Sequence, residues 1–354
     1  MTGAAARIGG RFRRGWAAYR LRWKRRELLW RCIRAFRQLT PLTDRTSGIR
    51  SGDILVFATI RNEIGRLPEF LSHYRALGVS HFLVVDNDSD DGSARLLAAQ
   101  PDVSLWRTGA SYRQARFGMD WLGALLFRHG HGHWCVTVDA DELLVYPDCD
   151  QRDLREMTSY LQGQNIRGIG GLMLDLYPRG RLDRADADED APLVQRLPYF
   201  DAGPYRCRVQ SPRRNRWVQG GVRERCFFSE RPERGPTLNK LPLIFWNRRY
   251  VYVNSTHSML PPTLNDLYDG PEDDRLSCVL LHSKFLPEIV SKSREELVRR
   301  QHFNDPDAYA GYHQALAEAP VLWREQSQRY DGPEQLVRLG LMKAGNWCTR
   351  DQAG

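Results

Sequence analysis

The chain has 354 residues, 42% hydrophobic and 27% charged, which suits one large domain or two average ones and excludes global disorder. Its net charge of +9 is unevenly spread: residues 1–50 hold 14 Lys or Arg and two acidic residues, so the remainder is slightly acidic. Seven cysteines without a C-x-x-C pair argue against a disulfide framework and a thiolate zinc site. No apolar stretch reaches the length of a membrane span or a secretory signal, so we expect an unprocessed cytoplasmic protein.

The basic arm at residues 1–50 is predicted to contain an amphipathic helix. One helical face gathers Trp16, Tyr19, Trp23, Trp30 and Ile33, and eleven Lys or Arg flank it between residues 11 and 37. Three interpretations of this helix are open. It contacts an anionic membrane from the inner, cytoplasmic side; it packs on its own domain and its arginines are solvated; or it binds nucleic acid. Nucleic acid is disfavoured because the acidic body offers no second basic face.

Apolar runs alternate with helical patterns between residues 51 and 180. Strands are predicted at 54–59, 81–86, 103–106, 133–138 and 170–177, and helices up to 77, up to 99, and over 112–129 and 150–164. Strands that are apolar throughout and alternate with helices predict an α/β fold. Its mostly parallel sheet would be flanked by helices on both faces.

After residue 178 the pattern changes. We expect a charged loop at 179–192 and short strands at 222–228, 243–245, 250–253 and 278–285, followed by a polar helical extension. The chain is therefore divided into an arm (1–50), a body (51–286, with halves 51–180 and 181–286) and an extension (287–354).

Polar clusters follow three of the predicted strands. They are Thr59 to Glu63, Asp86 to Asp91, and Asp139-Ala140-Asp141-Glu142. Ligands of open parallel sheets bind at the carboxyl ends of the strands. Packed carboxylates there repel one another, and a bound Mg²⁺ or Mn²⁺ would relieve that repulsion. The alternative is that these acids cap turns and helices. No phosphate-binding loop and no dinucleotide motif is present.

Three segments together resemble glycosyltransferase family 2, in particular its bacterial branch related to family 92. They are 59–79, beginning Thr-Ile-Arg-Asn-Glu; 85–93, beginning Val-Asp-Asn-Asp-Ser; and 138–142, Val-Asp-Ala-Asp-Glu. The resemblance covers about residues 53–180. It implies a GT-A fold, a nucleotide-sugar donor and a divalent metal, Mn²⁺ or Mg²⁺. The body would then be the glycosyltransferase domain, with a donor-binding half up to residue 180 and an acceptor half after it.

The resemblance also implies roles for individual residues. The donor would be bound by Thr59, Arg61, Asn62, Glu63, Asp86, Asp88 and Asp139, and the metal by Asp139 and Asp141. For Asn62 and Glu63 the alternative is a helix N-terminal cap.

The second half matches less sharply and leaves alternatives open. Arg223 or Arg225 would bind the diphosphate, and Glu224 would be the catalytic base. Strand alternation places Glu224 on the face opposite both arginines, so one of these assignments fails. Asp175 is the rival base. His257 and His282 are further candidate metal ligands, or structural histidines.

The function expected from these features is metal-dependent, inverting transfer of a sugar. The donor would be a nucleotide-sugar, with UDP-sugars preferred, and the acceptor a hydroxyl of a polysaccharide or lipid-linked glycan. The alternatives are a sugar nucleotidyltransferase of the same fold and a non-catalytic membrane or nucleic-acid adaptor that uses the basic arm.

Overall fold

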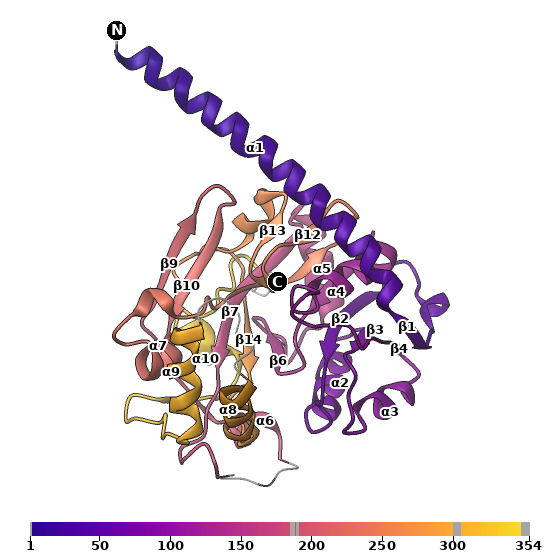
Figure 1. The fold of residues 1–354 in the computed structure, drawn as a ribbon, viewed down its shortest axis with the longest axis vertical. Coiled ribbons are helices and arrows are strands. Elements are labelled where there is room, and N and C mark those ends of the chain that lie inside the picture. Colours follow the sequence, from indigo (N-terminus) through magenta and orange to yellow (C-terminus); the bar gives the residue numbers. More distant parts are fainter. Residues whose placement is uncertain (1, 185–187, 189–190, 300–305, 348–354) are drawn as a thin grey trace, which may run out of the picture.

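The computed structural model describes residues 2–184, 188, 191–299 and 306–347 (Figure 1). Parts of the predicted loop at 179–192 and of the predicted extension lie outside them. The helices are α1 Thr2–Ala35, α2 Leu67–Ala76, α3 Ser93–Ala98, α4 Met119–Leu125, α5 Leu154–Gly163, α6 Leu193–Arg196, α7 Gly221–Phe227, α8 Glu288–Arg299, α9 Pro306–Ala317 and α10 Pro333–Arg338. The strands are β1 Thr40–Thr43, β2 Ile54–Ile60, β3 His81–Asp86, β4 Val103–Arg107, β5 Trp134–Thr137, β6 Glu142–Val145, β7 Gly168–Asp175, β8 Tyr199–Phe200, β9 Tyr205–Gln210, β10 Asn215–Gly220, β11 Asn239–Phe245, β12 Val251–Tyr252, β13 Met259–Leu260, β14 Cys278–His282 and β15 Gln328–Arg329.

A nine-stranded sheet organises the body, with the strand order β1-β4-β3-β2-β5-β11-β7-β14-β6. Six strands (β2, β3, β4, β5, β7 and β14) run in one direction, and β1, β6 and β11 run in the other. The α/β fold with a mostly parallel sheet flanked by helices is thereby confirmed. It is consistent with the GT-A-like fold that the resemblance implies.

Both faces of the sheet are buried, as the continuous apolar strands predict. Successive residues of β2 point to opposite faces. Val56 and Ala58 pack in the cluster that contains the apolar sides of α2, α3 and α5. Leu55 and Phe57 pack in the cluster that contains α4. The sheet therefore has a helical layer on each side.

The antiparallel strand β11 lies in the middle of the sheet, between β5 and β7. On its far side, β7 pairs in parallel with β14, and β14 pairs antiparallel with β6. In this register His282 lies opposite Asp175 on one side and Glu142 on the other. Residues far apart in the sequence therefore meet at one edge of the sheet.

Two predicted elements differ from the structure. The helix predicted over 112–129 begins only at Met119, because Arg116, Phe117 and Gly118 have φ values of 50°, 58° and 76°. The strand predicted over 222–228 is wrong, since this segment forms helix α7. Gly220 and Gly221, with φ values of 144° and 63°, end β10 and turn the chain into that helix.

Helix α1 belongs partly to the body and partly projects from it (Figure 1). Its C-terminal part buries Leu28, Cys32 and Ala35 against α4 and the β12–β13 region. The chain then forms β1, the antiparallel edge strand of the sheet. No helix of the described residues combines the length and apolar composition needed to cross a bilayer.

Candidate active site

A cavity of about 840 Å³ opens at the carboxyl ends of β2, β3 and β5. Its lining includes polar and charged residues from both halves of the body: Thr59, Arg61, Glu63, Asn87, Asp88, Tyr112, Arg113, Asp139, Asp141, Glu142, Arg223, Lys240, His257, His282 and Lys284. The placement is the one that the parallel strands predict. Acidic and basic side chains are present in it in similar numbers.

The Asp139–Glu142 turn joins β5 to β6 and directs its carboxylates to different partners. The Asp139 side chain is 48% exposed at the cavity, whereas the Glu142 side chain is 1% exposed. Glu142 folds back and accepts a hydrogen bond from the backbone N–H of Asp139 at 3.1 Å. Asp141 is fixed through its carbonyl, which accepts a hydrogen bond from the Ser283 N–H at 2.8 Å. The turn thus presents Asp139 and Asp141 to the cavity, whereas the Glu142 side chain is buried in the protein behind them.

Lys240 of β11 is a site residue that the sequence analysis missed. Its buried ammonium lies 2.7 Å from Oε1 of Glu142 and 3.3 Å from Oδ2 of Asp139. Burial alone would lower the pKa of Lys240, but Glu142 and Asp139 raise it above its ordinary value, so the group is a cation. The sequence feature that indicates such a role is a lysine within the mainly apolar segment 239–245. An unpaired charge is not tolerated at such a position.

A chain of charged groups crosses from the Asp139–Glu142 turn to α7. Asp141 Oδ2 lies 3.1 Å from Nε2 of His282, and the other ring nitrogen lies 2.6 Å from Oδ1 of Asp175. Arg223 donates to the same Asp175 oxygen at 2.7 Å. Burial opposes the charge on His282, yet Asp141 and Asp175 raise its pKa above the ordinary value. Nε2 faces Asp141, and Nδ1 lies close to Asp175 and, at 2.9 Å, to Arg223, so in this arrangement His282 orients Asp141 and neither nitrogen is directed to the cavity with a free lone pair.

His257 has a different environment. Its Nδ1 lies 2.5 Å from the carbonyl oxygen of Asn239, which accepts the hydrogen bond. Burial and nearby Lys240 lower the pKa of His257 to about 3, so the ring is neutral at pH 7. In the tautomer that donates from Nδ1, Nε2 keeps its lone pair. Histidines that bind a metal typically donate their other ring N–H to a carbonyl or carboxylate oxygen in this way.

The structure does not bring the two predicted base candidates to the cavity. Glu224 is on α7 and makes a bidentate ion pair with Arg206, at 2.7 Å for both contacts. Because the segment is a helix and not a strand, Arg223 and Arg225 diverge: Arg223 lines the cavity, and Arg225 pairs with Asp201 at 2.8 Å.

Asp175, the rival base, is 5% exposed and does not line the cavity. Burial would raise its pKa, but Arg223 and His282 hold the pKa at about 2. A carboxylate so stabilised in its charged form accepts a proton poorly. Asp175 therefore orients His282 and Arg223.

The predicted donor-binding residues divide into two groups. Thr59, Arg61, Glu63 and Asp88 line the cavity, whereas Asn62 and Asp86 do not. Asn62 exchanges hydrogen bonds with Asp90, and its backbone N–H donates to Ser89 at 3.0 Å, so it ties the β2 loop to the β3 loop. Asp86 is buried and accepts long hydrogen bonds, 3.3 Å, from the Ser89 N–H. Asn62 and Asp86 therefore stabilise the loops that line the cavity and do not line it themselves.

Glu63 is a cavity carboxylate whose pKa is affected by burial. It pairs with Arg66 at 2.6 Å and lies 3.6 Å from Nζ of Lys292. Burial nevertheless raises the pKa of Glu63 above its ordinary value. Lys284 is shifted too, since burial and Arg223 lower its pKa to about 8. Such shifted groups in a cavity are typical of functional sites.

The donor set fits a divalent cation that is shared with a substrate. Within the described residues, no three His, Cys, Asp or Glu side chains are arranged to hold an ion by themselves. Mg²⁺ and Mn²⁺ are commonly bound by one or two carboxylates together with substrate phosphates. Asp139 and Asp141 offer two such carboxylates on one turn, and His257 lines the same cavity.

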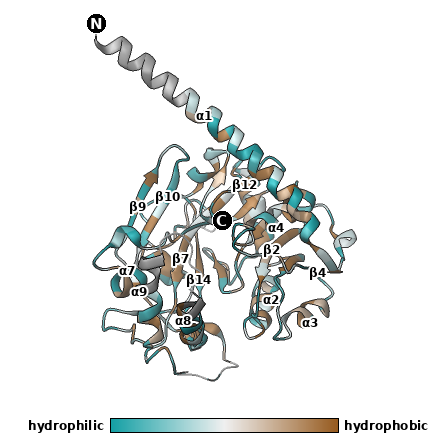
Figure 2. Ribbon diagram, viewed as in Figure 1, coloured by the Kyte–Doolittle hydropathy of each residue, from teal (hydrophilic) through white to brown (hydrophobic). Residues whose placement is uncertain are grey.

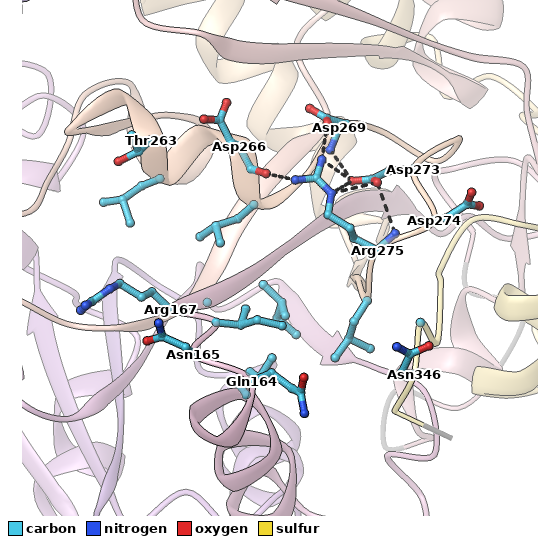
Figure 3. Close-up of a pocket in the computed structure, with 18 of the residues that line it drawn as sticks. Gln164, Asn165, Arg167, Thr263, Asp266, Asp269, Asp273, Asp274, Arg275 and Asn346 are labelled. Atoms are coloured by element: carbon cyan, nitrogen blue, oxygen red, sulfur yellow. Dashed lines mark hydrogen bonds and ion pairs between the residues drawn. The ribbon is translucent and has the colours of Figure 1, made fainter. Parts of the chain in front are cut away.

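A second cavity, of about 1120 Å³, lies at the opposite end of β7 and β14 (Figure 3). Three of its acidic residues have arginine partners within the fold: Arg275 binds Asp269, Asp273 and the carbonyl of Asp266. Asp266 also pairs with Arg214 at 2.7 Å. Arginines thus compensate these three residues, whereas Glu272 and Asp274, which also line the cavity, are exposed. The cavity lies at the amino ends of β7 and β14, away from the carboxyl ends at which ligands of such sheets bind.

The sequence matches no protein-family model and no curated protein. Among solved structures, the chain is similar to mannosyltransferase PcManGT from Pyrobaculum calidifontis, described in complex with GDP-Man and Mn²⁺. The identity is 20% and the TM-score 0.27, and the match covers 44% of this chain and 46% of that one. The chain thus matches less than half of that protein's length, and a likeness this partial does not bear on activity.

Proposed function

We propose that the protein is a metal-dependent, inverting glycosyltransferase that moves a sugar from a nucleotide-sugar to a hydroxyl of a glycan or lipid-linked acceptor. The observation that carries the proposal is the presentation of Asp139 and Asp141 by one turn, into a cavity that also contains Arg223 and Lys284. Carboxylates for a cation beside cationic groups for phosphates match the charges of a nucleoside diphosphate. The resemblance of residues 53–180 to family 2 supports the same conclusion.

The loops that follow β2, β3 and β4 would bind the nucleoside. Tyr112 is 42% exposed at the cavity and stands edge-on to Phe117, with ring centroids 5.6 Å apart. An exposed aromatic face is suited to stacking on a nucleobase. Thr59, Arg61 and Asp88 line the same cavity, and Asp88 is held by an ion pair with Arg107. A UDP-sugar is the donor that the family resemblance favours.

A divalent cation held by Asp139 and Asp141 would supply positive charge to the diphosphate of the donor. His257 is a further candidate ligand through Nε2. His282 and Asp175 hold Asp141 in its orientation, as the hydrogen bonds at 3.1 and 2.6 Å indicate. A correctly oriented carboxylate in place before binding avoids reorganisation during the reaction.

The acceptor oxygen would bond to the anomeric carbon while the bond from that carbon to the diphosphate breaks, and the electron pair leaves with the phosphate oxygen. Arg223 and Lys284 would stabilise the charge of this leaving group. The proton of the acceptor hydroxyl would pass to Glu63, because Glu224 and Asp175 lie away from the cavity and burial raises the pKa of Glu63.

The proposal is tested with the purified chain, a panel of nucleotide-sugars, and Mn²⁺ or Mg²⁺, by measuring nucleoside diphosphate release. We expect release with a UDP-sugar, loss on chelation, and a decrease of at least about a hundredfold in Asp141→Asn, since leaving-group stabilisation carries most of the catalysis. The matched control is Asp150→Asn, an exposed aspartate outside the cavity. Its activity should equal that of the wild type.

Two results would overturn the proposal. Undiminished release by a folded Asp141→Asn variant would exclude the assigned site. Release of inorganic pyrophosphate from a nucleoside triphosphate and a sugar phosphate, without release from nucleotide-sugars, would identify a nucleotidyltransferase instead.

A further inference from the structure

Helix α1 has a face that is fixed against the body. Leu28 and Cys32 are 2% and 1% exposed and pack with Val251, Val253 and Leu260. Cys32 lies so close to Gly123 of α4 that a methyl group on that glycine would collide with the Cys32 sulfur. This close contact sets the rotation of α1 about its own axis.

The aromatic residues of α1 lie on the opposite face. A helix turns about 100° per residue, so Cys32 is roughly half a turn from Trp23, and Trp16 and Trp30 lie on the same stripe as Trp23. These three tryptophans are 63%, 53% and 60% exposed, in the order Trp16, Trp23 and Trp30. A helix whose apolar residues served only to pack on the body would not place its tryptophans on this side.

The rings of Trp16, Tyr19 and Trp23 are in contact along the stripe. The rings of Trp16 and Tyr19 stack with centroids 5.7 Å apart, and Tyr19 meets Trp23 edge-on at 6.2 Å. Ile33 extends the stripe with an aliphatic side chain, 37% exposed. Rings already in contact with one another leave no slots for single bases, which disfavours stacking on single-stranded nucleic acid.

Positive charge surrounds the stripe. The exposed basic residues of the described side chains in α1 are Arg20, Arg22, Lys24, Arg26, Arg31 and Arg34. Lys24 pairs with Glu27 and Arg31 with Asp120. Arg26 lies over the ring of Trp23, 5.3 Å from its centroid. Figure 2 shows this part of α1 as mainly hydrophilic where it leaves the body.

We propose that the exposed face of α1, formed by Trp16, Tyr19, Trp23, Trp30 and Ile33, docks on the surface of an anionic phospholipid bilayer. Tryptophan and tyrosine rings are suited to the headgroup region, and flanking basic residues are attracted to anionic lipids. The helix lies on the membrane and does not cross it. This surface is separate from the cavity and does not depend on the proposed transferase activity.

The test is co-sedimentation of the full chain with vesicles of phosphatidylcholine, alone or with about 30% phosphatidylserine. We expect at least about tenfold stronger binding to the anionic vesicles, and weaker binding at high salt. The triple variant Trp16→Ser/Trp23→Ser/Trp30→Ser should lose at least about tenfold in binding. Arg20→Gln/Arg22→Gln/Arg26→Gln should lose the preference for anionic vesicles.

The matched control is Val209→Ser/Val321→Ser, which removes exposed apolar side chains from the body. It should bind like the wild type, and circular dichroism should give the same helix content for all variants, since the replaced side chains are exposed. Equal binding of wild type and the tryptophan variant would overturn the proposal. So would absence of binding to anionic vesicles, with or without binding to a single-stranded oligonucleotide. Nucleoside diphosphate release from soluble substrates is measured without lipid, so this failure would leave the proposed function intact.

Discussion

The carboxylates of the Asp139–Glu142 turn illustrate how neighbouring residues of one motif take separate roles. Glu142 is neutralised by Lys240, Asp141 is oriented by His282, and Asp139 stays half exposed at the cavity. Uncompensated carboxylates in a buried turn would each be costly. The pairing leaves two carboxylates directed at the cavity and one committed to the fold.

The Lys240–Glu142 pair leads to a prediction about stability. Lys240→Met leaves Glu142 buried without its partner, and we expect the free energy of unfolding to fall by about 3–5 kcal/mol. The double variant Lys240→Met/Glu142→Gln should recover a large part of that loss, because the Glu142 charge that lost its partner is removed as well. Urea unfolding of wild type, both single variants and the double variant gives the coupling energy. Additive effects of the two substitutions would contradict the pairing.

The role of Glu63 can be separated by kinetics. As the base, Glu63 must be ionised, so the rate should fall as the pH decreases through its pKa, which burial raises above the ordinary glutamate value. Glu63→Gln should lower kcat by about 10²–10⁴-fold and remove this acidic limb. A pH profile of kcat and KM is the measurement. A raised KM for the donor with unchanged kcat would assign Glu63 to donor binding instead.

At the scale of elements, strand β7 allows two neighbours to approach closely. A Cβ at Gly168, Gly170 or Gly171 would press on the backbone of β11 or β14. Gly171 lies opposite Cys278 in the register that also places Asp175 opposite His282. The glycines of this strand therefore hold the two strands at the distance that the Asp175–His282 contact requires.

Substitution of Gly171 tests this packing. In Gly171→Ala the added methyl group collides with the carbonyl of Cys278, and we expect a loss of about 1–3 kcal/mol in the free energy of unfolding. Gly163→Ala is the matched control, because no atom lies within 4 Å of its Cβ and it ends helix α5. That variant should be as stable as the wild type or slightly more stable. Equal urea midpoints for the two variants would show that β14 adjusts freely.

At the scale of the whole molecule, charge and shape are divided between the arm and the body. The basic residues concentrate on α1, whose inner face is packed on α4 and whose outer face is exposed. Two cavities of the body, at opposite ends of β7 and β14, are each lined by several acidic residues. The chemistry is placed in the cavity at the carboxyl ends of the parallel strands, where ligands of such sheets bind and where one turn presents Asp139 and Asp141.

The sequence alone determined the parallel part of the sheet and the placement of Asp139 and Asp141. Both follow from local patterns: uninterrupted apolar strands, alternating helices, and acids directly after a strand. It also determined the aromatic stripe of α1, since helical periodicity is local. Which side of α1 faces the body was decided only by its contact with α4 and the β12–β13 region.

The tertiary structure decided the remainder because those contacts join residues far apart in the chain. Lys240 reaches Glu142 only because β11 inserts between β5 and β7, and His282 reaches Asp141 across 141 positions. Glu224 was misplaced because positive φ values at Gly220 and Gly221 turn a strand-like sequence into α7. Side-chain partners of this kind depend on strand order and register, which local periodicity does not specify.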